Sequence, residues 1–185
     1  QTSASLFLVK NIFSILTTVF TLIAANLYPL YPTQLSLLGA FTIGTPAFVL
    51  ALQPNKELIR GDFLVNVILK ALPAGLADFI MLAAISIHGN ILGMSNEQIS
   101  TVAIVILLFI GLAALVRICR PFDGIRILLC LAMAAGIVIC VLNFKGIFAI
   151  TTVNMIMLRM IIMYALIAGV LFCIMCKSVG GWIDY

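Results

Sequence analysis

The sequence predicts an all-α fold: a polytopic membrane protein with a bundle of six transmembrane helices. Of its 185 residues, 64% are hydrophobic and only 9% are charged, whereas soluble domains carry roughly 25% charged residues. Uncharged runs are long, and residues 11–55, 98–116, 127–144 and 160–176 contain no charge at all. A spanning helix needs about 20 apolar residues. We therefore expect residues 1–185 to form a single transmembrane domain, without the soluble domains of an enzyme.

Turn-forming residues divide the apolar sequence into its helices. Proline, glycine, asparagine and aspartate cluster between the hydrophobic runs, as is typical of loops. Ser95 and Gln98 have the spacing of a capping box and mark the start of the fourth helix. The predicted spans are residues 5–27, 34–52, 63–87, 96–117, 124–142 and 152–176.

Basic residues predict the orientation of these helices. If the amino end is cytoplasmic, only Lys145 of the loop residues falls outside. An excess of basic residues marks the cytoplasmic side of a membrane protein. We therefore expect both termini in the cytoplasm of a multi-pass protein of the cell (plasma) membrane, with these residues on the inner side: Lys10, Lys56, Arg60, Arg117, Arg120, Arg126 and Lys177.

Composition and motifs also limit the function classes. The sequence has no phosphate-binding glycine-rich loop and no nucleophile elbow. Its only histidine, His88, is expected in an exposed outer turn. The basic residues are dispersed at helix ends, which does not suit nucleic-acid binding. We expect no catalytic residue and no cofactor in this chain, and the lipid bilayer is its first partner.

Three ionisable residues interrupt the predicted spans. An ionisable group at membrane depth costs several kcal/mol unless it snorkels, is paired or meets water. Lys70 is long enough to snorkel, but Asp78 is not. Asp78 and Arg159 lie at nearly the same predicted depth, in the third and sixth spans. This predicts an ion pair between them, which either pins the two helices together or belongs to an ion or proton path.

The second span carries helix breakers near its middle. Pro46 lacks an N–H donor and clashes with the carbonyl of Thr42 one turn back, and Gly39 and Gly44 permit a local distortion. Transporters use such broken helices to bind ions at the midplane. Freed carbonyls, together with the side chains of Asn11, Ser14 and Thr42, would supply the oxygen ligands that hard cations need. A plain proline kink is the alternative.

Two motifs resemble a known family. "YPTQL" followed by "IGTPAFVLALQPN" resembles the sixth transmembrane helix of cation-transporting P-type ATPases. "ASLFLVKNIFSIL" resembles the start of the fifth helix. The six spans are thus similar to the carboxy-terminal transmembrane domain, helices five to ten. The nearest type is the bacterial cation-transporting ATPase E, which is associated with calcium.

This resemblance implies a modified cation site. Calcium pumps of the family carry an asparagine and an acid on helix five, and these positions fall on Asn11 and Ser14. On helix six, an asparagine, a threonine and an aspartate fall on Gly39, Thr42 and Ile43. Both carboxylates are therefore replaced. The implied metal ligands are Asn11, Ser14 and Thr42, and the implied ion path consists of Asn11, Ser14, Thr42, Gly44 and Pro46.

The resemblance also implies a larger parent protein. ATP hydrolysis through a phospho-aspartate, with ATP and magnesium as cofactors, would take place in cytoplasmic domains absent from these residues. The implied partners are the transported cation, the cytoplasmic phosphorylation and nucleotide-binding domains, and the first four transmembrane helices. The charged residues 56–62 either form a simple connection or dock on the phosphorylation domain. Two alternatives stay open, a self-contained small ion or solute permease and a non-transporting scaffold.

Overall fold

The computed structural model describes residues 2–23, 30–52, 63–120 and 123–180. Within these ranges the chain is helical and has no strand, and six helical segments are long and apolar enough to cross a membrane. The predicted fold class is confirmed, and the chain is a multi-pass membrane protein. The elements are α1 (Thr2–Ile23), α2 (Pro32–Gly39), the π-helix η1 (Ala40–Gly44), α3 (Thr45–Ala51), α4 (Phe63–Ile91), α5 (Asn96–Ile118), α6 (Gly124–Asn143) and α7 (Met155–Gly180).

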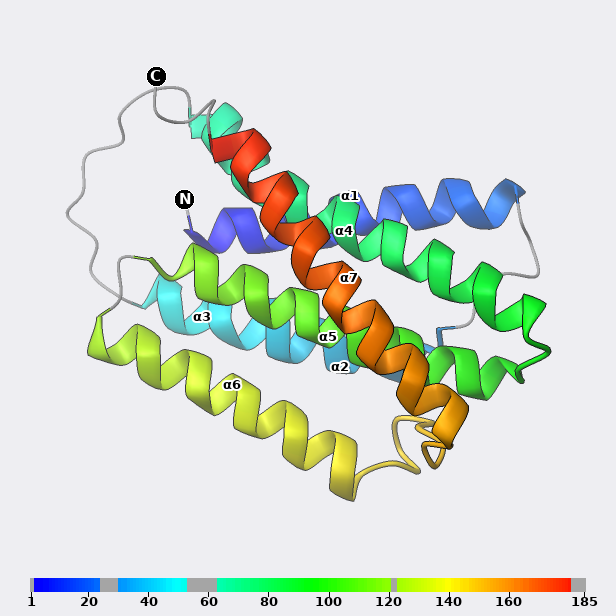
Figure 1. The fold of residues 1–185 in the computed structure, drawn as a ribbon. Coiled ribbons are helices and arrows are strands. Elements are labelled where there is room, and N and C mark those ends of the chain that lie inside the picture. The colour runs from blue at the N-terminus through cyan, green and yellow to red at the C-terminus, as the bar shows by residue number, and fades with distance from the viewer. Residues whose placement is uncertain (1, 24–29, 53–62, 121–122, 181–185) are drawn as a thin grey trace.

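Elements α2, η1 and α3 form one continuous span, Pro32–Ala51. Successive spans run in alternating directions, so the first turn of α1 and the last turn of α7 lie at the same end of the bundle (Figure 1). The charged residues 56–62, predicted to connect or to dock, lie outside the described residues. The side of the membrane on which each end lies stays a prediction.

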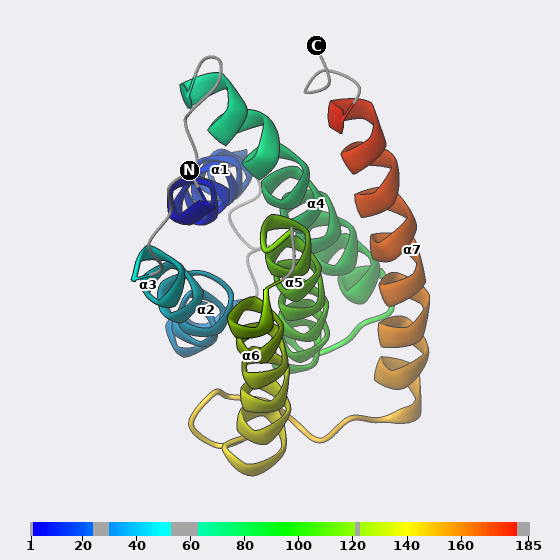
Figure 2. The same cartoon turned by 90° about the vertical axis from the view of Figure 1, so that its left-hand side faces the viewer.

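Helix α5 is the centre of the bundle. It contacts every other span, and Figure 2 shows it between α4, α6, α7 and the α2–α3 span. Its sequence is apolar on all sides, which is the pattern of a buried helix. Its first residues follow the predicted capping box, since Ser95 accepts a hydrogen bond from the Gln98 backbone and its own N–H donates to Gln98. Helix α5 therefore links the other spans, while α1 packs mainly on α4.

Helix α4 continues beyond its predicted end. It includes His88 in its last turns and ends at Ile91, so the expectation of an exposed loop histidine is wrong. The His88 ring is half-buried, and its Nδ1 lies 3.0 Å from the hydroxyl of Tyr164 on α7. That tyrosine hydroxyl also lies 3.2 Å from the Ala84 carbonyl oxygen, to which it donates. The contact between α4 and α7 is thus made near the end of α4.

A hydrogen-bonded cluster fixes the start of α2 against α5. Gln34 is fully buried; its side-chain oxygen accepts from the Ser100 hydroxyl, and its amide nitrogen donates to the Ala149 carbonyl at 3.3 Å. Beside it, the Thr101 hydroxyl accepts from the Thr151 backbone N–H at 3.1 Å. We call Gln34, Ser100, Thr101, Ala149 and Thr151 the Gln34 cluster. It ties α2, α5 and the loop before α7 together at one end of the bundle.

Candidate functional site

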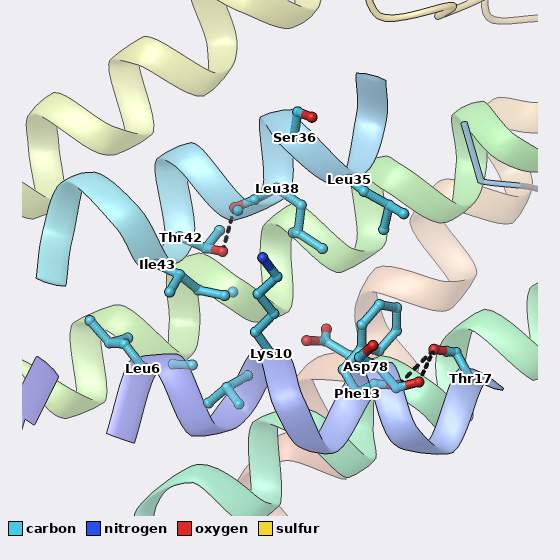
Figure 3. A pocket seen from close by; sticks show the side chains of 15 residues that line it. Leu6, Lys10, Phe13, Thr17, Leu35, Ser36, Leu38, Thr42, Ile43 and Asp78 are labelled. Atoms are coloured by element: carbon cyan, nitrogen blue, oxygen red, sulfur yellow. Dashed lines mark hydrogen bonds between the residues drawn. The ribbon is translucent and has the colours of Figure 1, made fainter. Parts of the chain in front are cut away.

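A cavity of about 420 Å³ lies between α1 and the α2–η1 segment. Helices α4 and α5 contribute Asp78, Gly111 and Ala114 to its lining. Figure 3 shows the side chains of Lys10, Thr42 and Asp78 around this space. The cavity is much larger than the space of one water molecule, which takes about 30 Å³. It is the place in the described bundle where polar side chains from three spans meet inside the membrane region.

The second span is distorted where its breakers predicted. Over residues 40–44 the backbone forms a π-helix, and the Thr45 N–H bonds to the Ala40 carbonyl five residues back. Pro46 explains this change, because it has no N–H to donate and crowds the preceding turn. The backbone nevertheless stays helical, with φ −61° and ψ −40° at Gly39 and φ −63° and ψ −61° at Gly44. The expectation of an opened backbone is corrected: the span widens by one residue per turn and does not unwind.

Thr42 lines the cavity and contacts both its own helix and α5. Its side chain is buried, and its hydroxyl donates to the Leu38 carbonyl at 2.6 Å. On α5, Gly111 leaves the room that the threonine occupies, since a Cβ there would lie 2.5 Å from the Thr42 Cγ2 atom. Gly39 also lines the cavity. Gly44 is exposed and Pro46 is buried, and neither lines the cavity, so these two candidates shape the span without facing the space.

Helix α1 presents one stripe to the cavity. Lys10, Phe13, Ser14 and Thr17 all line it, at the i, i+3, i+4, i+7 spacing of one helix face. Of the two α1 candidates, Ser14 is on this face, whereas Asn11 is exposed and outside the lining. Sequence reasoning missed Lys10 and Thr17, although the helical spacing around Ser14 could have found both.

Lys10 lies inside a membrane span. The sequence placed it within the first span, 5–27, and among the basic residues of the cytoplasmic side; the structure has it in the apolar segment Ala4–Leu22. Its side chain extends from α1 toward the α2–η1 segment (Figure 3). The Lys10 side chain is therefore part of the cavity lining.

The predicted ion pair between Asp78 and Arg159 is not formed. Asp78 is only 4% exposed and lines the cavity, and its Oδ1 atom has no hydrogen-bond partner among the described residues. Arg159 is exposed on α7. The number of residues from each helix end predicts the depth of a charged side chain, but it does not predict the direction in which that side chain points. Asp78 faces the cavity on the α1 side of α4, whereas α7 contacts α4 through His88 and Ala84.

The cavity is lined by oxygen-bearing polar groups and one ammonium. Its hydroxyls belong to Ser14, Thr17, Ser36 and Thr42, and its carboxylate to Asp78. Among the described residues, no group of three or more histidine, cysteine, aspartate or glutamate side chains could hold a metal ion. Oxygen ligands suit hard cations such as sodium, magnesium or calcium, and soft metals prefer sulfur and nitrogen.

Fold and site together define a polytopic helical membrane protein with a charged cavity beside a π-helical span. Sequence comparison identifies its relatives. The chain is 31% identical over 141 residues to the "Probable cation-transporting ATPase exp7" of Streptococcus pneumoniae. It is 34% identical over 150 residues to the "Calcium-transporting ATPase CtpE" of Mycobacterium bovis, and 29% identical over 168 residues to the CtpE protein of Mycolicibacterium smegmatis.

These matches cover 72%, 74% and 82% of this chain but only 18%, 19% and 21% of the three relatives. The chain thus spans about a fifth of the length of the curated relatives it matches. The predicted family is confirmed: the chain is homologous to a part of bacterial cation-transporting P-type ATPases. No protein-family model matches the sequence, and the comparison with solved structures found no match to this chain.

Proposed function

We propose that this chain is the membrane domain of a P-type ATPase that moves a cation, with calcium the favoured ion, across the plasma membrane. The transport is coupled to ATP hydrolysis in cytoplasmic domains outside these residues, where ATP and magnesium bind. The observation that carries this proposal is the homology of about three quarters of the chain to proteins named as cation-transporting ATPases, two of them calcium-transporting.

The cavity supports a role in the ion path. It adjoins the π-helical segment, and its wall carries the hydroxyls of Thr17 and Thr42 and the carboxylate of Asp78. π-helical turns occur frequently at functional sites. In this proposal α1 and the Pro32–Ala51 span carry the path, and α5 holds them in place. Both termini face the cytoplasm, and four further helices of the parent protein pack beside α1 and the Pro32–Ala51 span.

The coding sequence upstream of Gln1 provides the first test. We expect a D-K-T-G-T phosphorylation motif a few hundred residues before this chain, and its absence would exclude a P-type ATPase. The second test uses the whole parent protein, purified and reconstituted in vesicles. We expect ATP hydrolysis that depends on calcium and ATP-driven movement of radioactive calcium. Calcium flux that proceeds equally without ATP would instead identify a permease.

A further inference from the structure

The Asp78 carboxyl group is buried and incompletely hydrogen-bonded among the described residues. It is 4% exposed, it faces the cavity, and its Oδ1 atom receives no hydrogen bond from any described residue. A buried carboxylate is normally paired, hydrogen-bonded or bound to a metal, because burying a bare charge is costly. Arg159 on α7 does not supply the missing partner either, since it is exposed and does not line the cavity. The group is therefore placed for a partner that enters the cavity.

Neutral oxygens line the same cavity as this carboxylate. The hydroxyls of Thr17 and Thr42 donate to the carbonyls of Phe13 and Leu38 in their own helices, at 2.7 and 2.6 Å. A hydroxyl that donates in this way keeps its lone pairs as acceptors, and both side chains line the cavity. Ser14 adds a third hydroxyl. One carboxylate with several neutral oxygens is a ligand set for a hard cation.

Lys10 brings the opposite charge to the same cavity. Lys10 and Asp78 are the only charged residues in its described lining, and the lysine extends across the space between α1 and α2 (Figure 3). The Lys10 ammonium is a positive charge in the same cavity lining. It repels a cation that enters. The two side chains should therefore affect cation affinity in opposite directions.

We propose that Asp78 is the anionic ligand of a hard-cation site in this cavity and that Lys10 opposes cation binding there. This rests on the proposed function, because it names the group that binds the transported ion. It also chooses between the two roles that the sequence left open for Asp78, since a carboxylate from α4 would stand in for those missing at Ser14 and Ile43.

The test compares Asp78→Asn, Lys10→Gln and the control Arg159→Gln in the purified parent protein. The control removes another charge that interrupts a span, one that is exposed and outside the cavity lining. The measurement is equilibrium calcium binding, together with the rise in melting temperature that calcium causes. Both readouts are independent of ATP hydrolysis. A protein that binds calcium through Asp78 but does not pump would contradict the proposed function alone.

We expect Asp78→Asn to weaken calcium binding at least about tenfold and to abolish the calcium-dependent rise in melting temperature. Lys10→Gln should strengthen binding by roughly threefold, and Arg159→Gln should change it by less than about twofold. Without calcium, Asp78→Asn should melt at the same temperature as the parent protein or higher, because it replaces an incompletely hydrogen-bonded buried carboxyl group by a neutral amide of the same shape.

Three results would overturn the proposal. The first is unchanged calcium affinity in Asp78→Asn. The second is a shift in the same direction for Asp78→Asn and Lys10→Gln. The third is an Asp78→Asn protein that fails to fold or melts lower without calcium, which would identify a structural carboxylate. A zinc titration tests which kind of ligand holds the metal, because zinc favours nitrogen and sulfur ligands. If zinc bound more tightly than calcium and Asp78→Asn did not change its affinity, the metal site would lie elsewhere in the protein.

Discussion

Two buried polar sites in this bundle differ in how their hydrogen bonds are satisfied. In the Gln34 cluster, the glutamine oxygen and nitrogen both have partners, supplied by α5 and by the loop before α7. In the cavity, Asp78 has an oxygen with no partner among the described residues. A satisfied polar cluster fixes a unique packing, whereas an unsatisfied one needs an explanation outside the packing. The contrast separates a polar group that stabilises the fold from one that is available to a ligand.

The largest effect on stability is expected from Gln34→Leu. The substitution leaves the fully buried Ser100 hydroxyl and the half-buried Ala149 carbonyl without their present partner. Leaving buried polar groups unpaired should cost about 3 kcal/mol of unfolding free energy. Thermal or denaturant unfolding of the purified protein in detergent measures this loss. Calcium affinity should stay within about twofold of the parent value, because the cluster lies outside the cavity lining.

A matched control for Gln34→Leu is Ser178→Ala. The Ser178 hydroxyl is exposed and donates to the Ile174 carbonyl of its own helix, so its loss should change stability by less than about 0.5 kcal/mol. If Gln34→Leu were as mild as Ser178→Ala, the Gln34 cluster would not be a stabilising element. The distinction between the two polar sites would then fail.

A smaller effect on stability, with a second effect on binding, is expected from Gly111→Ala. The added methyl group would collide with the Thr42 side chain, and overpacking of this kind costs about 2 kcal/mol. Because Thr42 lines the cavity, its displacement should also weaken calcium binding. The control is Gly169→Ala on α7, where a Cβ meets no atom within 4 Å. Normal calcium affinity in a destabilised Gly111→Ala protein would show that Thr42 is not part of the cation site.

The sequence predicted the helices well because hydropathy and turn residues act locally. The capping box at Ser95 forms as expected, and the distortion of the second span falls between Gly39 and Pro46. The direction in which each side chain points was harder to predict. Residue counting placed Asp78 and Arg159 at one depth, but the face that each helix presents depends on packing with α1, α5 and α7, which are far apart in sequence.

The same limit applies to the candidate site. Breakers near Pro46 locate a distortion, but they do not distinguish an unwound segment from a π-helix, and the contact of Thr42 with Gly111 joins two spans that are far apart in sequence. Family resemblance pointed to α1, and Ser14 does line the cavity. It could not indicate Asp78, because the negative charge comes from a helix with no motif match.

The smallest effect is expected from Asn11→Leu. Resemblance to the family makes Asn11 a metal ligand, yet its side chain is exposed beside the cavity stripe and does not line the cavity. Its neighbour Lys10 does line it, because adjacent residues on a helix point about 100° apart. Calcium affinity of Asn11→Leu should therefore stay within about twofold of the parent value, whereas Thr42→Val, which removes a lining hydroxyl, should weaken binding more. Calcium titrations of both variants test whether Asn11 is a ligand of the cation site. If Asn11→Leu weakened binding tenfold or more, the cation site would extend onto the face of α1 that this chain leaves uncovered.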